Sequence, residues 1–457
     1  MLALAYADPR GRLIEEADLG AMARSGWEVG EAEEVIPDTT WMPLPDGATV
    51  ASLPGRMALA RDHDGEVVQL SPEAGWAVAA VLPPGYTRTL LPAYEEDGEV
   101  QVLPIFGYAA LAFRRGRPVV AAVRTDPLDW WQPDQFRGRD ISAAIEAAGR
   151  DMPANRLVGH LARCATDYNC YTAQNTFYRR WEGSLPTSGP CNAMCVGCIS
   201  EQWGEVKSPQ DRIGFRPTPD EVVELALWHL GGEGSAIVSF GQGCEGEPLM
   251  RADLPEIVAR IKAERPNAFV NINTNGSRPD VIRSMVEAGL DGARVSIFSF
   301  SDDLFRAYYR PKDYGLEQIH ETLGALRAGG CQVAINLLSL PGVSDDEGEV
   351  AALEDAIDRH GIDQVQMRSL NTDPLWMLRQ LPRRTRGMGL ETMMARLTAG
   401  FSELRIGNFT VPKPRSTSQA RSNPNLKNGY LYSRRGLRRR QSATGVRPRR
   451  QPTEPNP

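Results

Sequence analysis

The sequence of 457 residues contains no long hydrophobic run that could cross a membrane. Uninterrupted apolar stretches stay well short of the roughly eighteen residues that a spanning helix needs. The first twenty residues turn acidic after a short apolar start, which is not the pattern of a secretory signal peptide. We therefore expect a cytoplasmic protein that makes no contact with a membrane.

Histidine and cysteine are also scarce, with five and seven residues respectively. Three of the cysteines fall within eight consecutive positions, and this crowding excludes an evenly spaced disulfide framework. In a reducing cytosol a tight group of cysteines favours a metal site over disulfides. The remaining cysteines are scattered: Cys164, Cys170, Cys244 and Cys331.

The charge of the chain is unevenly distributed. Twelve Lys or Arg and one acid lie within 413–457, so this tail carries +11 while the rest carries −18 of the overall −7. Low apolar content combined with charge of one sign predicts a disordered basic C-terminal tail. Clustered arginines also suit nucleic acid. A solvated tail is our expectation, with nucleic-acid binding as the alternative.

The chain is long enough for two domains and additional segments. Residues 1–150 hold short apolar runs separated by turn signals, for example within 101–126, and this predicts a β-rich N-terminal domain of unknown role. Residues 151–184 are interpreted as a linking segment. Residues 185–400 show a different pattern of apolar residues, and the tail covers 413–457.

Within 185–400, short apolar strands alternate with helical patterns. Thr218, Pro219 and Glu221 form a helix start with a capping box. The alternation predicts right-handed β-α-β crossovers and a parallel sheet, and the count approaches six units. The predicted fold is α/β: a partial (β/α)6-type TIM-like barrel that follows the β-rich domain. Strands are expected at 236–240, 269–273, 292–298, 332–340 and 364–370.

The crowded cysteines form a C-x3-C-x2-C loop made by Cys191, Cys195 and Cys198. Thiolates are the ligands that iron–sulfur clusters prefer, and three of them leave one iron of a four-iron cluster open. The alternative is a structural zinc site, which requires four ligands. Cys164 or Cys170 could supply the fourth ligand, although neither stands at zinc-finger spacing.

Three further motifs follow the loop in order: Gly246-Glu247-Pro248 after the second strand, Asn273-Thr274-Asn275-Gly276 after the third, and Arg294-Val295-Ser296 on the fourth. With the cysteine loop, this series resembles the radical S-adenosylmethionine (radical SAM) superfamily over about 185–400. A carboxylate in a glycine-rich turn can accept from a ligand ammonium, because glycine lets the backbone approach closely. Asn and Ser at strand ends can orient a ligand.

The resemblance implies that Cys191, Cys195 and Cys198 bind a [4Fe-4S] cluster, that Gly246 and Glu247 hold the SAM amino group, and that Asn275 and Ser296 assist. It implies reductive cleavage of SAM to a 5′-deoxyadenosyl radical, which abstracts hydrogen from an unknown substrate. It also implies an electron donor such as a flavodoxin or ferredoxin. The residue that acts on the substrate is unknown.

Several residues near these motifs leave alternatives open. Glu245 is a second candidate for the role of Glu247. Gly197 stands where many members of the superfamily have an aromatic residue near the adenine. Cys244 is interpreted as a small buried residue, and an auxiliary cluster at Cys164 and Cys170 is not expected because too few partner cysteines exist. The histidines are expected to be structural or superficial: His160, His229, His320 and His360.

Two alternative functions follow from the same residues. One is a zinc-stabilised nucleic-acid-binding protein that uses the basic tail. The other is a radical SAM enzyme that acts specifically on RNA or on a peptide. Sequence alone does not name the substrate, because one fold supports many reactions.

Overall fold

The computed structural model describes residues 2–126, 129–201, 208–234, 236–369 and 372–412. These residues belong to one compact unit, Met1–Lys413. No helix within them is long and apolar enough to span a membrane. The predicted basic tail, 413–457, lies outside the described residues.

The N-terminal part is a 13-stranded sheet whose paired strands are antiparallel, with the central order β11-β6-β2-β1-β12-β13-β4. Its strands are rich in buried alanine, for example Ala77, Ala79 and Ala80 on β8 and Ala121 and Ala122 on β13. The strands are β1 (Ala3–Ala7), β2 (Leu13–Ser25), β3 (Glu28–Glu31), β4 (Trp41–Pro43), β5 (Thr49–Ser52), β6 (Arg56–Arg61), β7 (Val67–Gln69), β8 (Trp76–Val81), β9 (Tyr86–Arg88), β10 (Leu91–Pro92), β11 (Tyr94–Glu96), β12 (Leu111–Arg114) and β13 (Arg117–Arg124).

A two-residue turn joins β12 to β13. Arg115 and Gly116 both have positive φ, 54° and 74°, as a tight hairpin that follows the twist of its strands requires. The turn predicted at this place in the sequence is confirmed.

The second sheet has seven parallel strands in chain order, β14 to β20. The five strands predicted from the alternation are confirmed as β15 to β19, and β14 and β20 extend the sheet at its two edges. The predicted α/β class is therefore confirmed. The strands are β14 (Glu182–Ser184), β15 (Ile237–Phe240), β16 (Phe269–Thr274), β17 (Gly292–Ile297), β18 (Gln332–Leu338), β19 (Gln364–Arg368) and β20 (Arg405–Gly407).

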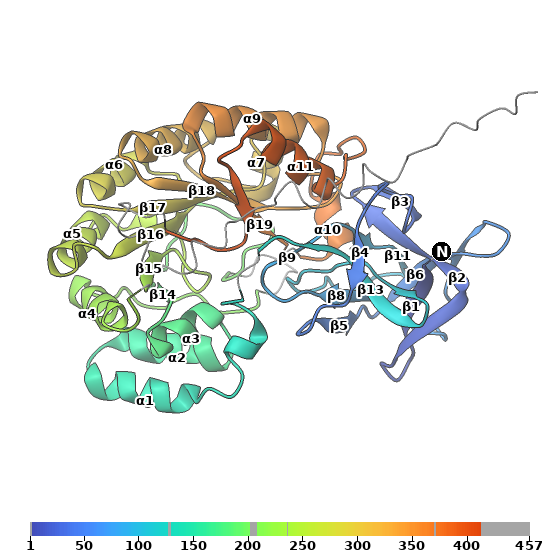
Figure 1. Cartoon of the computed structure of the whole chain (residues 1–457), viewed down its shortest axis with the longest axis horizontal. Helices are drawn as coiled ribbons and strands as arrows, with labels where there is room; N and C mark the ends of the chain where they lie inside the picture. The colour runs from blue at the N-terminus through green and yellow to red at the C-terminus, as the bar shows by residue number, and fades with distance from the viewer. Residues whose placement is uncertain (1, 127–128, 202–207, 235, 370–371, 413–457) are drawn as a thin grey trace, which may run out of the picture. The chain divides into compact units, whose positions relative to one another are not determined.

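Helices connect these strands and, apart from α10, which lies beside the N-terminal strands, follow the outer side of the parallel sheet (Figure 1). The predicted start of α4 is confirmed: the Thr218 side chain accepts from the Glu221 N–H, Glu221 accepts in return from the Thr218 N–H, and Pro219 is the first helical residue. The helices are α4 (Pro219–Leu230), α5 (Leu254–Glu264), α6 (Pro279–Glu287), α7 (Asp302–Tyr309), α8 (Leu316–Ala328), α9 (Glu347–His360), α10 (Pro374–Arg379) and α11 (Leu390–Gly400).

Three helices precede the parallel sheet: α1 (Ile141–Asp151), α2 (Arg156–Thr166) and α3 (Tyr171–Tyr178). Residues 151–184, interpreted from the sequence as a linking segment, thus contain α2, α3 and the first parallel strand. Side-chain oxygens of Asp140 and Asn155 accept from the first backbone N–H groups of α1 and α2. Helices α1 and α2 therefore have the N-terminal side-chain caps that stabilise short helices, whereas Cys170 supplies none to α3.

Buried cations join the N-terminal sheet to the carboxyl ends of the parallel strands. Arg88 on β9 is fully buried and donates to the carbonyl oxygens of Ser369 (2.9 Å) and Ser339 (3.0 Å). Arg56 on β6 forms a buried ion pair with Asp373. Since buried charged groups need hydrogen-bonded partners, these contacts fix the N-terminal sheet beside the carboxyl-end edge of the parallel sheet, where ligands bind in open α/β folds.

Candidate active site

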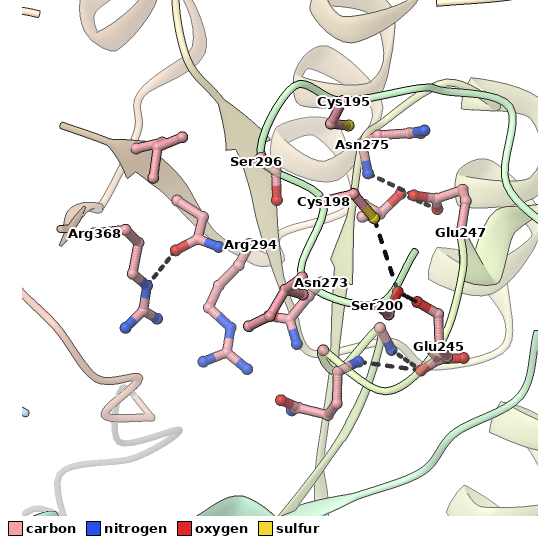
Figure 2. A pocket seen from close by; sticks show the side chains of 18 of the residues that line it. Cys195, Cys198, Ser200, Glu245, Glu247, Asn273, Asn275, Arg294, Ser296 and Arg368 are labelled. Carbon is pink, nitrogen blue, oxygen red and sulfur yellow. Dashed lines mark hydrogen bonds between the residues drawn. The ribbon is translucent and has the colours of Figure 1, made fainter. Parts of the chain in front are cut away.

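A cavity of about 590 Å³ lies at the carboxyl ends of the parallel strands (Figure 2). Its wall contains every residue that the sequence proposes for the site: Cys191, Cys195, Cys198, Gly246, Glu247, Asn275 and Ser296. The fold therefore brings together residues that are up to 105 positions apart in the chain. Pro84 and Ile105 of the N-terminal part also line it.

The three cysteines lie on a loop that follows β14 and is held by the end of α7. The backbone N–H groups of Met194 and Val196 donate to the carbonyl oxygens of Tyr309 and Tyr308, each at 2.9 Å. Asn192 fixes the start of the loop: its Oδ1 accepts from Asn275 Nδ2 (2.9 Å), and its own Nδ2 donates to Asp313 (2.8 Å). Segments that follow the third and fourth central strands of the parallel sheet therefore set the shape of the loop.

The donor set fits a metal cluster that is larger than a single ion. All three thiols are free and partly buried. Their sulfur atoms do not form a group within 4.8 Å of one another in the described structure, whereas a tetrahedral zinc site would draw sulfurs to roughly 3.8 Å, given bonds of about 2.3 Å. Arg212 places Nη2 3.6 Å from Cys198 Sγ.

The local environment opposes ionisation of the other two thiols in the absence of a metal. Burial raises the pKa of Cys191 to about 11, and burial together with the neighbouring sulfurs raises the pKa of Cys195 well above its usual value. A bound cluster would supply the positive charge that keeps both as thiolates. The site is therefore consistent with three-cysteine ligation of an iron–sulfur cluster.

The glycine-rich loop after β15 runs directly against the cysteine loop. A Cβ atom on Gly246 would lie 2.2 Å from the carbonyl oxygen of Pro190, and the Gly246 N–H donates to Ser188 (2.7 Å). Gly241 has φ +73°, and a Cβ there would lie 1.7 Å from the Asn273 carbonyl oxygen. Both positions need glycine because no side chain fits between the backbones.

The two glutamates of this loop have different surroundings. Glu245 accepts five hydrogen bonds, two from backbone N–H groups of its own loop and three from Thr187 and Ser188. Glu247 accepts three: from the Leu249 N–H (3.0 Å), the Thr274 hydroxyl (2.5 Å) and the Asn275 N–H (2.7 Å). Glu245 therefore braces the loop, and Glu247 lies on the cavity wall with spare acceptor capacity.

Burial raises the pKa of Glu247 to about 7, although its three donors act in the opposite direction. A ligand cation would favour the ionised carboxylate and lower this pKa again. The carboxylate is thus suited to a positively charged partner in the cavity.

The side chains of Asn275 and Ser296 differ in their hydrogen-bond partners and in their access to the cavity. The Asn275 side chain is engaged by Asn192 and by the Ser277 N–H, so it supports the cysteine loop. Ser296, at the end of β17, lines the cavity and is only partly buried. Arg310 lies outside the cavity wall; it ends α7 with φ 44° and donates to Gln380.

Sequence reasoning assigned no role to three charged groups of the cavity wall, although it quoted Arg294 within a motif. Glu182 and Arg294 form a buried ion pair, and Arg368 on β19 donates to Asn336 Oδ1 (2.5 Å) and Gln366 Oε1 (2.6 Å). Burial lowers the pKa of Arg368 to about 10, so it stays charged at neutral pH. The available signal was the run of polar residues at alternate positions of strands that otherwise read as buried.

Tyr308 occupies space beside Gly197, where the sequence departs from the superfamily pattern. A Cβ on Gly197 would lie 3.2 Å from the Tyr308 hydroxyl oxygen. The Tyr308 ring stacks on Phe298 with centroids 4.6 Å apart. An aromatic ring from α7 therefore lies close to the third cysteine although the cysteine loop itself provides none.

Comparison with known proteins assigns this site to a class. Residues 185–353 match the model of the Radical SAM superfamily. Residues 185–353 thus carry the features of a radical SAM domain, and members of this superfamily use a [4Fe-4S] cluster and SAM. The matched segment contains the cysteine loop and the strand ends that line the cavity.

Curated relatives include two GTP 3′,8-cyclases. The protein of Streptomyces coelicolor is 30% identical over 158 residues, which cover 34% of this chain and 44% of that protein. The protein of Chlorobaculum tepidum is 27% identical over 224 residues, covering 48% and 62%. The chain thus spans about half the length of the curated relatives it matches. Among solved structures, Streptococcus suis SuiB bound to S-adenosylmethionine aligns with a TM-score of 0.36 and 11% identity, covering 72% of this chain and 75% of that one.

Proposed function

We propose that this enzyme reductively cleaves SAM at a [4Fe-4S] cluster held by Cys191, Cys195 and Cys198 and uses the product to abstract hydrogen from a substrate. When bound, the cluster and SAM supply one-electron reduction and a 5′-deoxyadenosyl radical; the protein supplies binding and orientation. One observation carries the proposal: three free thiols and a buried carboxylate with spare acceptor capacity line the same cavity. An electron donor such as a flavodoxin or ferredoxin is part of it.

The residues of the glycine-rich loop and the strand ends would hold SAM. A carboxylate offers four acceptor positions, and the protein fills three on Glu247. The fourth would accept from the SAM ammonium. Gly246 allows the loop to lie against the cysteine loop, Ser296 offers a hydroxyl to the cavity, and Asn275 acts by fixing the cysteine loop.

The substrate would carry one negatively charged group. Three cations line the described cavity: Arg212 pairs with Glu201 (2.5 Å), Arg294 pairs with Glu182, and Arg368 has no carboxylate partner among the described residues. The hydrogen bonds described for Arg368 go to the neutral amides of Asn336 and Gln366, and the charges of Glu182 and Asp126 act on it without a direct ion pair being described. Such a guanidinium can bind a carboxylate or phosphate in a fork. We propose that Arg368 binds this group.

The GTP of the curated relatives fits this cavity less well. A triphosphate brings several negative charges, but Glu182 and Glu201 neutralise two of the three lining arginines. A substrate with a single carboxylate or phosphate matches the one unpaired cation. RNA and a peptide remain alternatives to a small molecule, since each can present one such group.

We further propose the organisation of the chain around this site. The parallel sheet would be a partial barrel of (β/α)6 type, extended at each edge, within 185–400. The β-rich domain within 1–150 would close the mouth of the barrel, because Pro84 and Ile105 reach the cavity wall and Arg88 binds the strand ends. Residues 151–184 join the two, and 413–457 follow the barrel.

The test is anaerobic turnover. Reconstituted enzyme is mixed with reductant, SAM and pools of anionic compounds, and 5′-deoxyadenosine is quantified. We expect slow release without substrate and at least tenfold faster release with a pool that holds the substrate. Arg368→Gln should keep the slow release and lose the stimulation, while Arg310→Gln, outside the cavity wall, should retain both. Absence of 5′-deoxyadenosine from cluster-loaded enzyme contradicts the proposed reaction. Stimulation that survives in Arg368→Gln contradicts the anion site alone.

A further inference from the structure

A second group of thiols and an imidazole lies behind the glycine-rich loop. His160 and Cys164 are four residues apart on α2, so they share one face of the helix. Cys244 reaches them from the loop that follows β15. One ring nitrogen of His160 and the two sulfur atoms all lie within 4.8 Å of one another, and His160 Nε2 is 3.9 Å from Cys164 Sγ. These residues are separate from the three cysteines of the cluster loop.

The surroundings hold this group in place. Cys164 and Cys244 are 1% and 4% exposed, and neither forms a disulfide. The Cys244 carbonyl oxygen accepts from the Ile213 N–H (2.8 Å), and the His160 ring stands edge-on to Phe215. His160 is only partly buried, which leaves its ring beside solvent and gives an ion a way in.

The chemistry of the three side chains selects a particular kind of ion. Thiolate and imidazole ligands together suit zinc, which is tetrahedral with bonds of about 2.0–2.3 Å and ligand atoms therefore roughly 3.3–3.8 Å apart. The 3.9 Å between His160 Nε2 and Cys164 Sγ is already close to that spacing. Ordinary apolar packing would not require an imidazole to point at two buried sulfurs.

We propose that His160, Cys164 and Cys244 bind a structural zinc ion. Cys170 follows on the chain at the start of α3 but is not one of the ligand atoms that lie within 4.8 Å of one another, so water would supply the fourth ligand. The expectation from the sequence that His160 and Cys244 are ordinary structural residues is then incomplete. The inference uses none of the residues that hold the iron–sulfur cluster.

The position of the ion gives it a role. Cys244 directly precedes Glu245, the residue that braces the glycine-rich loop, and lies three positions before Glu247. A zinc ion would join α2 to this loop through residues that are not part of the described cavity wall. It would act as a positioning element for the SAM-binding loop and would take no part in the reaction.

The test measures zinc and iron separately in the reconstituted full-length protein after dialysis against a weak chelator. We expect about one zinc per chain in addition to the cluster iron. Cys244→Ala and His160→Gln should each lower zinc affinity at least tenfold and leave iron loading near that of the wild type. Matched controls are Cys331→Ala, a buried cysteine that donates to Leu290, and His320→Gln; both should keep zinc. Cys191→Ala should lose iron and keep zinc.

A measurement on the unmodified enzyme covers the case in which these variants fold poorly. X-ray absorption at the zinc edge should show two sulfur ligands and an imidazole. Three sulfurs without an imidazole would place the zinc in the cluster loop and overturn the proposal. Less than about 0.2 zinc per chain, or a disulfide between Cys164 and Cys244 by mass spectrometry, would overturn it as well. None of these results changes the count of cluster iron.

Discussion

Replacement of Glu247 by glutamine tests the assignment of the SAM-binding loop. The substitution keeps the shape of the side chain and removes its charge. Oε1 already accepts two hydrogen bonds and Oε2 accepts one, so one acceptor position on Oε2 is left for a ligand. Glutamine places either its amide nitrogen or a weaker neutral oxygen at that position.

The expected loss follows from the strength of one charge-assisted hydrogen bond. Such a bond contributes about 1.5–3 kcal/mol, and each 1.4 kcal/mol corresponds to about a tenfold change in affinity. SAM binding by Glu247→Gln should therefore weaken about ten- to a hundredfold. The cluster should still assemble, because Glu247 provides none of the thiolates and the cysteine loop keeps its contacts with α7.

Glu245→Gln is the matched control, and the structure predicts a different outcome for it. Each Glu245 oxygen accepts from at least two donors, so an amide nitrogen at either place faces buried N–H groups. Each unsatisfied donor costs about 1–3 kcal/mol of folding stability, so two of them should lower the thermal midpoint of Glu245→Gln. The iron content should fall as well, because Glu245 braces the loop that lies against the cysteine loop.

The assay is an anaerobic titration of SAM against both reconstituted variants, with iron content and thermal midpoint measured in parallel. The reasoning is refuted if Glu245→Gln loses SAM affinity at normal stability while Glu247→Gln binds SAM normally. If neither variant loses affinity, the loop does not bind the SAM ammonium.

Three further outcomes are expected. Arg156 lowers the pKa of Glu221 to about 2, so the ionised pair stabilises the fold above pH 4.5, and this stabilisation fades as pH falls towards 2. Urea unfolding of Glu221→Gln should show a loss of stability of about 1 kcal/mol at pH 7, a value discounted for solvent screening, and a smaller loss in acid. An equal loss at all pH values would contradict this role of the pair. Asn192→Ala leaves the Asn275 amide without its hydrogen-bond partner and should lower the stability of the fold by about 1–3 kcal/mol. The variant should also lose its cluster faster in a chelator challenge. A rate of cluster loss equal to that of the wild type would contradict this expectation. Truncation before Pro414 should preserve iron loading and SAM cleavage, because the residues found to line the described cavity all precede position 410. If the truncated protein folds but does not cleave SAM, the tail belongs to the site.

The parallel strands and their helices could be predicted from sequence because their signals are local. Each signal spans only a few consecutive residues. This holds for the capping box of Thr218 and Glu221 and for each apolar strand between 237 and 368. The cysteine loop and the order of motifs likewise needed no tertiary information. Strands β14 and β20, three residues each, carry too short a pattern to be recognised and exist because the neighbouring strand pairs with them.

The finer parts of the site depend on partners that are distant in sequence. The difference between Glu245 and Glu247 is set by Thr187, 58 positions away, and by Asn275, 28 positions away. The convergence of His160 with Cys244 requires α2 to pack behind the glycine-rich loop, which no local pattern shows. Arg88 is another example, since its partners lie more than 250 positions later.

The most direct test of the central claim is the count of iron and acid-labile sulfide in the single variants Cys191→Ala, Cys195→Ala and Cys198→Ala after anaerobic reconstitution. Three thiolates are the smallest set that holds a four-iron cluster with one iron open. We expect about four iron and four sulfide per chain in the wild type and in Cys331→Ala, and stable loading in none of the three variants. Full loading in all three would contradict the assignment of the cluster to this loop.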